Sequence, residues 1–160
     1  MPFDCKDTDL NEFLLNDSKN YLGKLLSVTY IIEYNGEILA FFSVSNDKIS
    51  AVEVKSDGTL FNKLFRNKMP HGKRFRSFPA VKIGRFGVHH SYQGKGFGGK
   101  LLDYIKGMFI TNNRTGCQYI TVDAYKQSLL FYEKNGFKYF TEDDKDEDTR
   151  QMYFSLLDLV

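Results

Sequence analysis

The pattern of apolar and polar residues predicts helices and strands that alternate along the chain. A first helix is expected over residues 8–22, where apolar residues recur at helical spacing behind Asp7, a residue type that caps helices well. Two β-rich runs follow, at residues 27–34 and 37–44. The Asn35-Gly36 pair between them favours a tight hairpin, because both central positions of a type I′ turn need a positive φ.

The second half of the chain is dominated by a strand, a turn and a helix. Alternating apolar residues predict a strand over residues 80–88, and an apolar stripe predicts a helix over residues 97–110. The less regular region before this strand contains one expected short helix, at residues 60–66. The remaining expected elements are a strand at residues 118–124, a helix at 127–135 that ends at Asn135-Gly136, and an antiparallel pair at 137–140 and 151–157. This order predicts one α/β (α+β) domain over residues 1–160.

A glycine-rich turn at residues 93–99, with the sequence QGKGFGG, lies where the predicted strand ends and the predicted helix begins. Unpaired amides and the positive end of the helix dipole face the same small volume there, and glycine lets the backbone approach an anion closely. The turn therefore predicts a binding site for phosphate or pyrophosphate.

Dinucleotide-binding proteins use a similar turn. The run from Gly94 to Gly99 satisfies the pattern G-x-G-x-x-G, and Asp123 follows at roughly the distance of a ribose-binding acid. However, residues 89–93 separate the strand from Gly94, and only 37 residues follow Asp123, too few to complete a six-stranded doubly wound sheet. These two observations disfavour a nicotinamide cofactor.

A second family fits more of the chain. The run Ile83-Gly84-Arg85-Phe86-Gly87-Val88, followed by Gln93-x-x-Gly96-x-Gly98, resembles the acyl-CoA signature of the GNAT superfamily of N-acetyltransferases. Downstream, ITVDA at residues 120–124 resembles that family's next strand, and FYEKNGF at residues 131–137 resembles its helix-to-strand element. The resemblance implies a GNAT-like, mixed and mainly antiparallel central sheet flanked by helices, with a βαβ unit that binds acyl-CoA.

The same resemblance implies where acetyl-CoA, the cosubstrate, would bind. Main-chain groups of Phe86 and Val88 would pair with the pantetheine amides, and the amides of the glycine turn would hold the pyrophosphate. Gly87 fits a close approach of the cofactor, with simple packing as the alternative. The full set of implied cofactor-binding residues is Phe86, Gly87, Val88, Gln93, Gly94, Lys95, Gly96, Phe97 and Gly98.

Tyr132 stands at the tyrosine of the family's helix-to-strand element, which implies that it protonates the departing thiolate. A phenol with a pKa near 10 stays protonated at neutral pH and can supply that proton, although an aromatic core residue is the alternative. No general base is assigned, because His89 and His90 are more simply a pair in a surface turn. Asp123 is expected either to bind the substrate amine or to serve as a capping or structural carboxylate.

Direct transfer to the amine is favoured over an acyl-enzyme, because the sequence has no G-x-S-x-G elbow and neither cysteine has an adjacent base pattern. Cys5 and Cys117 are expected to be free thiols, and their spacing predicts no metal site. No secretion signal or membrane-spanning run stands out, so a cytoplasmic location without a membrane partner is expected.

Charge is unevenly distributed although the net charge is only +2. Residues 63–85 hold eight basic side chains and no acidic one, so Lys73, Arg74 and Arg76 are candidates for contacts to the phosphates of CoA or of an anionic substrate. Residues 142–148 hold six acidic side chains and are expected to form a solvated loop.

The acceptor is left as an unspecified primary amine. An alternative comes from the N-terminal run from Phe3 to Leu14, which resembles the subgroup that includes toxins acetylating aminoacyl-tRNA, although His89 stands where that pattern usually has an acidic residue. That alternative implies tRNA and an antitoxin protein as partners, and a homodimer is also left open. A catalytically silent CoA-binding or interaction module is a third hypothesis, disfavoured by the presence of both the glycine turn and Tyr132.

Overall fold

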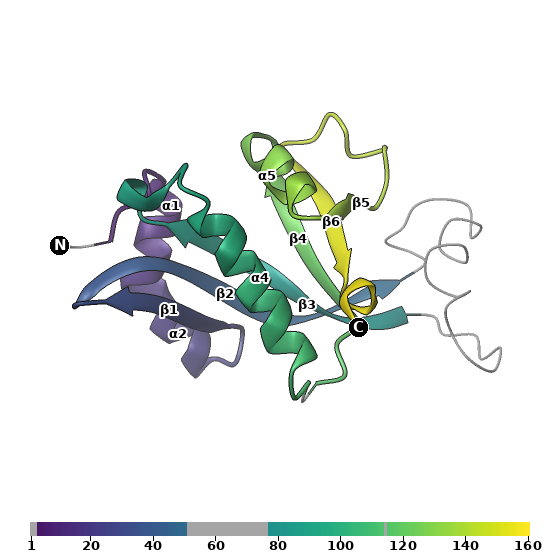
Figure 1. The fold of residues 1–160 in the computed structure, drawn as a ribbon, viewed down its shortest axis with the longest axis horizontal. Helices are drawn as coiled ribbons and strands as arrows, with labels where there is room; N and C mark the ends of the chain where they lie inside the picture. Colours follow the sequence, from purple (N-terminus) through teal and green to yellow (C-terminus); the bar gives the residue numbers. More distant parts are fainter. Residues whose placement is uncertain (1–2, 51–76, 114) are drawn as a thin grey trace. The chain divides into compact units, whose positions relative to one another are not determined.

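A computed structural model of the chain describes residues 3–50, 77–113 and 115–160. Its six strands form one sheet in the order β1-β2-β3-β4-β6-β5, with antiparallel pairing of β1 to β2, β4 to β6 and β5 to β6 (Figure 1). The strands are β1 (Val28–Tyr34), β2 (Glu37–Ser50), β3 (Ser77–Val88), β4 (Tyr119–Tyr125), β5 (Lys138–Tyr139) and β6 (Thr149–Ser155). The predicted mixed, mainly antiparallel sheet with flanking helices is confirmed. The short helix expected at residues 60–66 lies outside the described residues.

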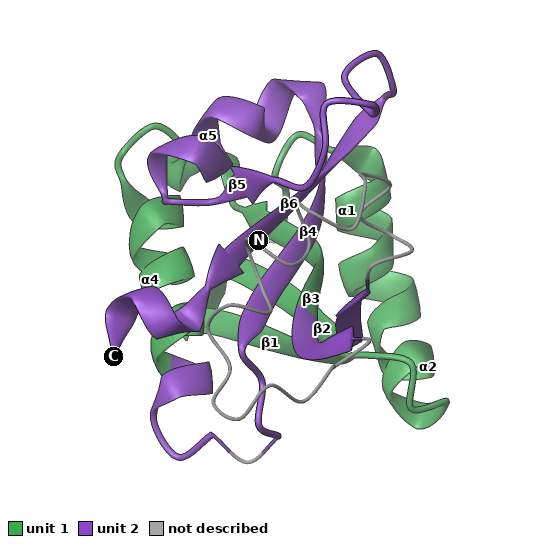
Figure 2. Ribbon diagram, turned by 90° about the vertical axis from the view of Figure 1, so that its right-hand side faces the viewer, with its two compact units in different colours: residues 1–46, 82–107 green, residues 47–81, 108–160 purple. Residues whose placement is uncertain are grey.

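The chain divides into two compact units (Figure 2). Unit 1 comprises residues 1–46 and 82–107, and unit 2 comprises residues 47–81 and 108–160. Unit 1 therefore holds the N-terminal helices, the hairpin and the turn after β3, whereas unit 2 holds β4 and everything that follows it.

The first helix of unit 1 covers the predicted range but is not uniform. It consists of α1 (Thr8–Glu12), a π-helical turn η1 (Phe13–Asp17) and α2 (Ser18–Gly23). The predicted cap is confirmed, since the Asp7 carboxylate accepts a hydrogen bond from the amide of Leu10 at 3.0 Å. The π-turn is seen in the bond from the Ser18 amide to the carbonyl of Phe13, and was not predicted because a one-residue expansion leaves the helical sequence pattern almost unchanged.

The hairpin of unit 1 is confirmed. Asn35 and Gly36 have φ values of 52° and 79°, as a type I′ turn requires. Strand β2 continues to Ser50, beyond the expected end at residue 44. The extension was not predicted because the last part of the strand alternates between exposed and more buried positions and so lacks a continuous apolar run. The apolar core beside the hairpin contains Phe3, Cys5, Phe13, Leu14 and Phe41.

Helix α4 (Phe97–Ile110) has the predicted bounds and links β3 to β4, which are neighbours in the sheet. Leu101, Leu102 and Ile105 on its apolar stripe are buried. Burial of this face fixes helix α4, and with it the first turn of the helix, where the glycine run ends.

Unit 2 is built on the ladder between β4 and β6, which runs from Tyr119 opposite Ser155 to Tyr125 opposite Thr149. The predicted helix before β5 appears as a 3₁₀ turn η5 (Lys126–Ser128) and α5 (Leu129–Lys134). The predicted stop is confirmed, because Gly136 has φ +86° and its amide bonds to the carbonyl of Glu133 at 3.0 Å.

The acidic run at residues 142–148 is not simply a solvated loop, and that expectation is wrong for Asp144. This carboxylate is buried, accepting hydrogen bonds from Arg150 Nε at 2.9 Å and from the amide of Gln151 at 2.8 Å. The Arg150 guanidinium also lies over the ring of Tyr139, with its Cζ 3.8 Å from the ring centroid. The charge pair between Asp144 and Arg150, six residues apart in sequence, therefore organises the middle of the run.

Candidate functional site

The turn after β3 has a backbone conformation that favours glycine at two positions. The chain leaves Val88, makes the 3₁₀ turn η4 (His90–Tyr92) and enters α4 at Phe97. Gly94 and Gly96 have φ values of 71° and 78°, a region that residues with side chains rarely adopt. A Cβ built on either glycine would meet no atom within 4 Å, so these glycines are required by conformation and leave open space beside the backbone.

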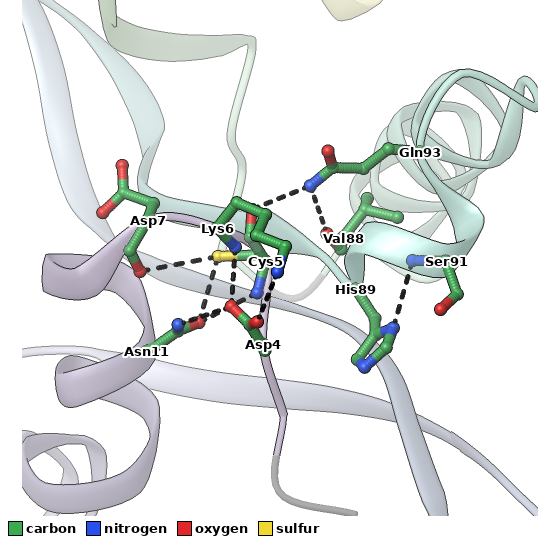
Figure 3. A network of polar contacts seen from close by, with 9 residues as sticks. All are labelled: Asp4, Cys5, Lys6, Asp7, Asn11, Val88, His89, Ser91 and Gln93. Carbon is green, nitrogen blue, oxygen red and sulfur yellow. Dashed lines mark hydrogen bonds and ion pairs between the residues drawn. The ribbon is translucent and has the colours of Figure 1, made fainter.

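Gln93 contributes its side chain to the structure of this turn. Its Nε2 group donates to the carbonyl of Val88 at 2.8 Å and to the carbonyl of Cys5 at 2.9 Å (Figure 3). Lys95 folds back in the same turn, and its Nζ donates to the carbonyl of Ser91 at 2.8 Å. The side chains of Gln93 and Lys95 thus stabilise the turn by hydrogen bonds to main-chain carbonyls. The sequence had predicted only cofactor binding for these two residues.

The two histidines have structural partners. His89 Nδ1 accepts a hydrogen bond from the amide of Ser91 at 3.2 Å and so caps η4, as Figure 3 shows. The amide of His90 donates to the carbonyl of Asp4 at 2.9 Å, and the two imidazole rings stack with centroids 4.4 Å apart. The interpretation of this pair as part of a surface turn is confirmed.

Gly87 on β3 is explained by packing. A Cβ at this position would lie 2.6 Å from Cε1 of Phe41, so that ring would have to move, and it would meet Cζ of Phe3 at an ordinary contact distance of 3.4 Å. Its contact with a cofactor stays a prediction, as do those of Phe86 and Val88.

Tyr132 lies on α5 in unit 2 and is almost completely buried, with 5% of its surface exposed. Its ring packs edge-to-face against Phe131 and Phe137, with centroids 5.1 and 5.2 Å away. Burial raises the pKa of the phenol well above its usual value. Its hydroxyl forms no hydrogen bond within the described part of the chain. The ring of Tyr132 is therefore part of the core, and its hydroxyl is protonated at neutral pH and makes no hydrogen bond to another described residue.

Asp123 is exposed on β4, opposite Gln151 of β6. Asp123 is not the N-cap residue of η5 or α5, because those residues are Tyr125 and Ser128. Its role as an amine-binding or a structural carboxylate stays a prediction. The basic candidates Lys73, Arg74 and Arg76 lie outside the described residues.

The described residues, 3–50, 77–113 and 115–160, include both cysteines. Cys5 and Cys117 are buried free thiols, as predicted, and burial raises the pKa of both. Within these ranges no three His, Cys, Asp or Glu side chains come together as a metal site would need. No helix in the same ranges is long and apolar enough to cross a membrane.

Sequence reasoning missed the roles of Asp4 and Asn11. Asn11 Oδ1 accepts from the amide of Cys5 at 3.0 Å and from its thiol at 3.2 Å, while Asn11 Nδ2 donates to Asp4 Oδ1 at 3.0 Å (Figure 3). Both residues belong to the N-terminal run that resembles a GNAT subgroup. The resemblance of that run was the available signal for a functional role. Its contacts with residues 90 and 93 could not be predicted from a local pattern, because these residues are far apart in sequence.

The family follows from a comparison over most of the chain. The sequence profile described as "Acetyltransferase (GNAT) domain" matches residues 26–139. The chain belongs to the GNAT acetyltransferase family. This match includes β3, the glycine turn, α4 and Tyr132, and it places the chain in an acetyltransferase family rather than a dinucleotide-binding one.

Solved structures share the fold of this GNAT chain. AtaT complexed with acetyl-methionyl-tRNAfMet has 20% identity and a TM-score of 0.76, with 98% of this chain and 87% of that chain covered. A tyrosine-to-phenylalanine mutant of KacT has 20% identity and a TM-score of 0.75, with 99% and 89% covered. A mutant AtaT toxin bound to acetyl-CoA and the C-terminus of the antitoxin AtaR has 18% identity and a TM-score of 0.72, with 98% and 85% covered.

Proposed function

We propose that this GNAT acetyltransferase moves the acetyl group of acetyl-CoA directly to a primary amine in a ternary complex. The observation that carries the proposal is the turn between β3 and α4. It combines two positive-φ glycines, open space beside the backbone and the N-terminal end of a 14-residue helix. These features suit a pyrophosphate, because free amides and the helix dipole stabilise its charge.

In this proposal the amides of residues 93–98 hold the pyrophosphate, and the main chain at Phe86 and Val88 pairs with the pantetheine arm. Such pairing extends the sheet as an added strand would. A backbone amide at the end of β3 can polarise the thioester carbonyl, so no dedicated side chain is needed for that step. The amine attacks this carbonyl, the carbon–sulfur bond breaks, and the electron pair remains on sulfur as a thiolate.

Tyr132 is proposed to protonate that thiolate. The phenol is protonated at neutral pH, and its hydroxyl donates to no acceptor within the described residues, so the proton is free to move to the thiolate. The attacking nitrogen loses its own proton to water, since no side chain is assigned as a base. Asp123 is proposed to attract the amine through its exposed carboxylate.

Aminoacyl-tRNA is the second candidate acceptor, with an antitoxin protein as a partner. It is supported by the fold shared with AtaT, which has been solved with acetyl-methionyl-tRNAfMet, and by the eight basic residues between positions 63 and 85. Phosphate contacts from such residues supply most of the affinity of proteins for nucleic acid.

An acceptor panel tests the function. The purified chain is incubated with acetyl-CoA and with polyamines, free amino acids, peptides or charged tRNA, and release of the CoA thiol is followed. One acceptor class should release thiol well above the background without acceptor. Binding of acetyl-CoA without thiol release for any acceptor would instead indicate a silent binding module, and binding of NADH alone would contradict the proposal.

A homodimer is also proposed, through the edge of β1, which is the end strand of the sheet among the described residues. Strand β1 ends the strand order, and nine exposed large apolar side chains belong to it or to the segment before it: Leu15, Tyr21, Leu22, Leu25, Leu26, Val28, Tyr30, Ile31 and Tyr34. A second copy suits this edge because Glu33 is the one charged residue of β1, and antiparallel self-pairing centred on Ile31 would place it opposite Thr29 rather than another Glu33.

A further inference from the structure

We propose that the N-terminal segment of residues 3–6 is a strap that holds the acetyl-CoA turn in its binding geometry, with Asn11 and the Gln93 side chain as positioning residues. The proposal rests on the proposed function, since it assigns these residues to the affinity for acetyl-CoA. None of the strap contacts involves the reacting atoms.

The strap touches the turn at two backbone carbonyls. The carbonyl of Asp4 accepts from the amide of His90 at 2.9 Å. The carbonyl of Cys5 accepts from Gln93 Nε2 at 2.9 Å, as Figure 3 shows. The same Nε2 group donates its other hydrogen to Val88 at the end of β3. Gln93 therefore joins the strap, the end of β3 and the start of the glycine run through one amide group.

Asn11 gives the strap its shape. Its oxygen accepts from both the amide and the thiol of Cys5, and its nitrogen donates to the carboxylate of Asp4. That carboxylate also accepts from the amide of Lys6, which has a positive φ of 67°, at 2.8 Å. A residue with a side chain rarely adopts this conformation, so the local hydrogen bonds are needed to keep the chain there.

Preorganisation explains why such a strap would matter. The amides of residues 94–98 can bind an anion only when they point together, and ordering a loop during binding reduces affinity. Gly94 and Gly96 are conformationally free residues, so the turn has little stiffness of its own. The fixed contacts of Gln93 on one side and helix α4 on the other limit that freedom.

The test compares Asn11→Ala with Asn113→Ala. Asn113 is a matched control because its side chain organises another short loop, donating to the carbonyl of Cys117 at 3.0 Å and accepting from the amides of Thr115 and Cys117. Both variants lose comparable hydrogen bonds. Only Asn11→Ala should raise the KM and the Kd for acetyl-CoA, by about 10-fold, while kcat at saturation changes less than about 2-fold.

A second variant keeps the test decisive if Asn11→Ala does not fold. Gln93→Met has a side chain of similar length, adds no charge beside the proposed pyrophosphate site and removes both Nε2 hydrogens, and it should weaken acetyl-CoA binding by at least about 10-fold. Hydrogen exchange of the ligand-free protein supplies a readout besides activity. The amides of residues 89–98 should exchange faster in Asn11→Ala and Gln93→Met than in the wild type or Asn113→Ala.

The outcomes separate the two proposals. Failure of the wild type to bind acetyl-CoA would overturn the proposed function. Wild-type binding with unchanged acetyl-CoA affinity and unchanged exchange in Asn11→Ala and Gln93→Met would overturn the strap alone. Equal losses of acetyl-CoA affinity in Asn11→Ala and Asn113→Ala would also overturn it, because the effect would then be a general loss of stability.

Discussion

At the scale of the residue, Tyr132 gives the clearest separation of chemistry from packing. Tyr132→Phe keeps the ring contacts with Phe131 and Phe137 and removes only the hydroxyl. Turnover should fall by roughly 10²–10⁴-fold, the contribution of a positioned acid, while the melting temperature and the Kd for acetyl-CoA change little. Steady-state kinetics on the folded variant measure this. Near-wild-type turnover would mean that water or another residue supplies the proton.

Gly96 can be tested against a glycine of nearly the same conformation. Gly36 has φ +79° and Gly96 has φ +78°, and neither has an atom within 4 Å of the position of a Cβ. Gly36→Val and Gly96→Val should therefore lose similar stability, on the order of 1–2 kcal/mol, because both force a β-branched residue into the left-handed region. Only Gly96→Val should abolish acetyl-CoA binding in calorimetry. Intact binding in Gly96→Val would place the pyrophosphate elsewhere.

Asp4 predicts a pH dependence of the N-terminal segment. The amide of Lys6, followed by the side chain of Asn11, lowers the pKa of Asp4 to about 2. Because the folded pKa lies below the unfolded value of about 3.9, this stabilising contribution is complete above pH 4 and is lost as the pH falls toward 2. Urea unfolding of the wild type should show this loss, and Asp4→Asn should lack it. Identical pH profiles below pH 4 would contradict the assignment.

At the scale of the element, sequence patterns predicted the regular helices and strands well and the polar pairs between non-adjacent residues poorly. Helix α4 was predicted with its observed bounds, because its apolar stripe and the glycine run before it are both local signals. Local composition could not predict the burial of Asp144, since this depends on Arg150 across the loop. The same limit applies to the strap, because Cys5 and Gln93, which form one of its hydrogen bonds, are 88 residues apart in sequence. The glycine turn of the candidate site was recognisable, but its supporting contacts were not.

Strand β1 carries the prediction about self-association. Ile31→Lys places a charge on the edge of β1 and should shift the chain from dimer to monomer in light scattering at micromolar concentration. Leu130→Lys is the matched control, because Leu130 is an exposed apolar residue of unit 2 and should leave the dimer intact. A wild-type chain that is monomeric over the same concentrations would contradict the proposed interface.

At the scale of the whole molecule, the family and fold class followed from the order of three motifs, whereas the acceptor did not. If the acceptor is tRNA, replacing Lys73, Arg74 and Arg76 together with Ala should weaken tRNA binding and reduce its salt dependence. The slope of log K against log salt concentration should fall by about 2–3, with little change in acetyl-CoA affinity. Equal losses for both ligands would assign these residues to CoA instead.

The most direct test of the central claim is the stoichiometry of acetyl transfer. The chain is mixed with acetyl-CoA and its best acceptor, and the released CoA thiol and the N-acetylated product are quantified in the same sample by absorbance and mass spectrometry. Direct transfer to an amine predicts one new amide for each thiol released, and a much lower rate for both in Tyr132→Phe. Thiol release without an N-acetylated product, or acetyl-CoA binding without any thiol release, would contradict the assignment as an N-acetyltransferase.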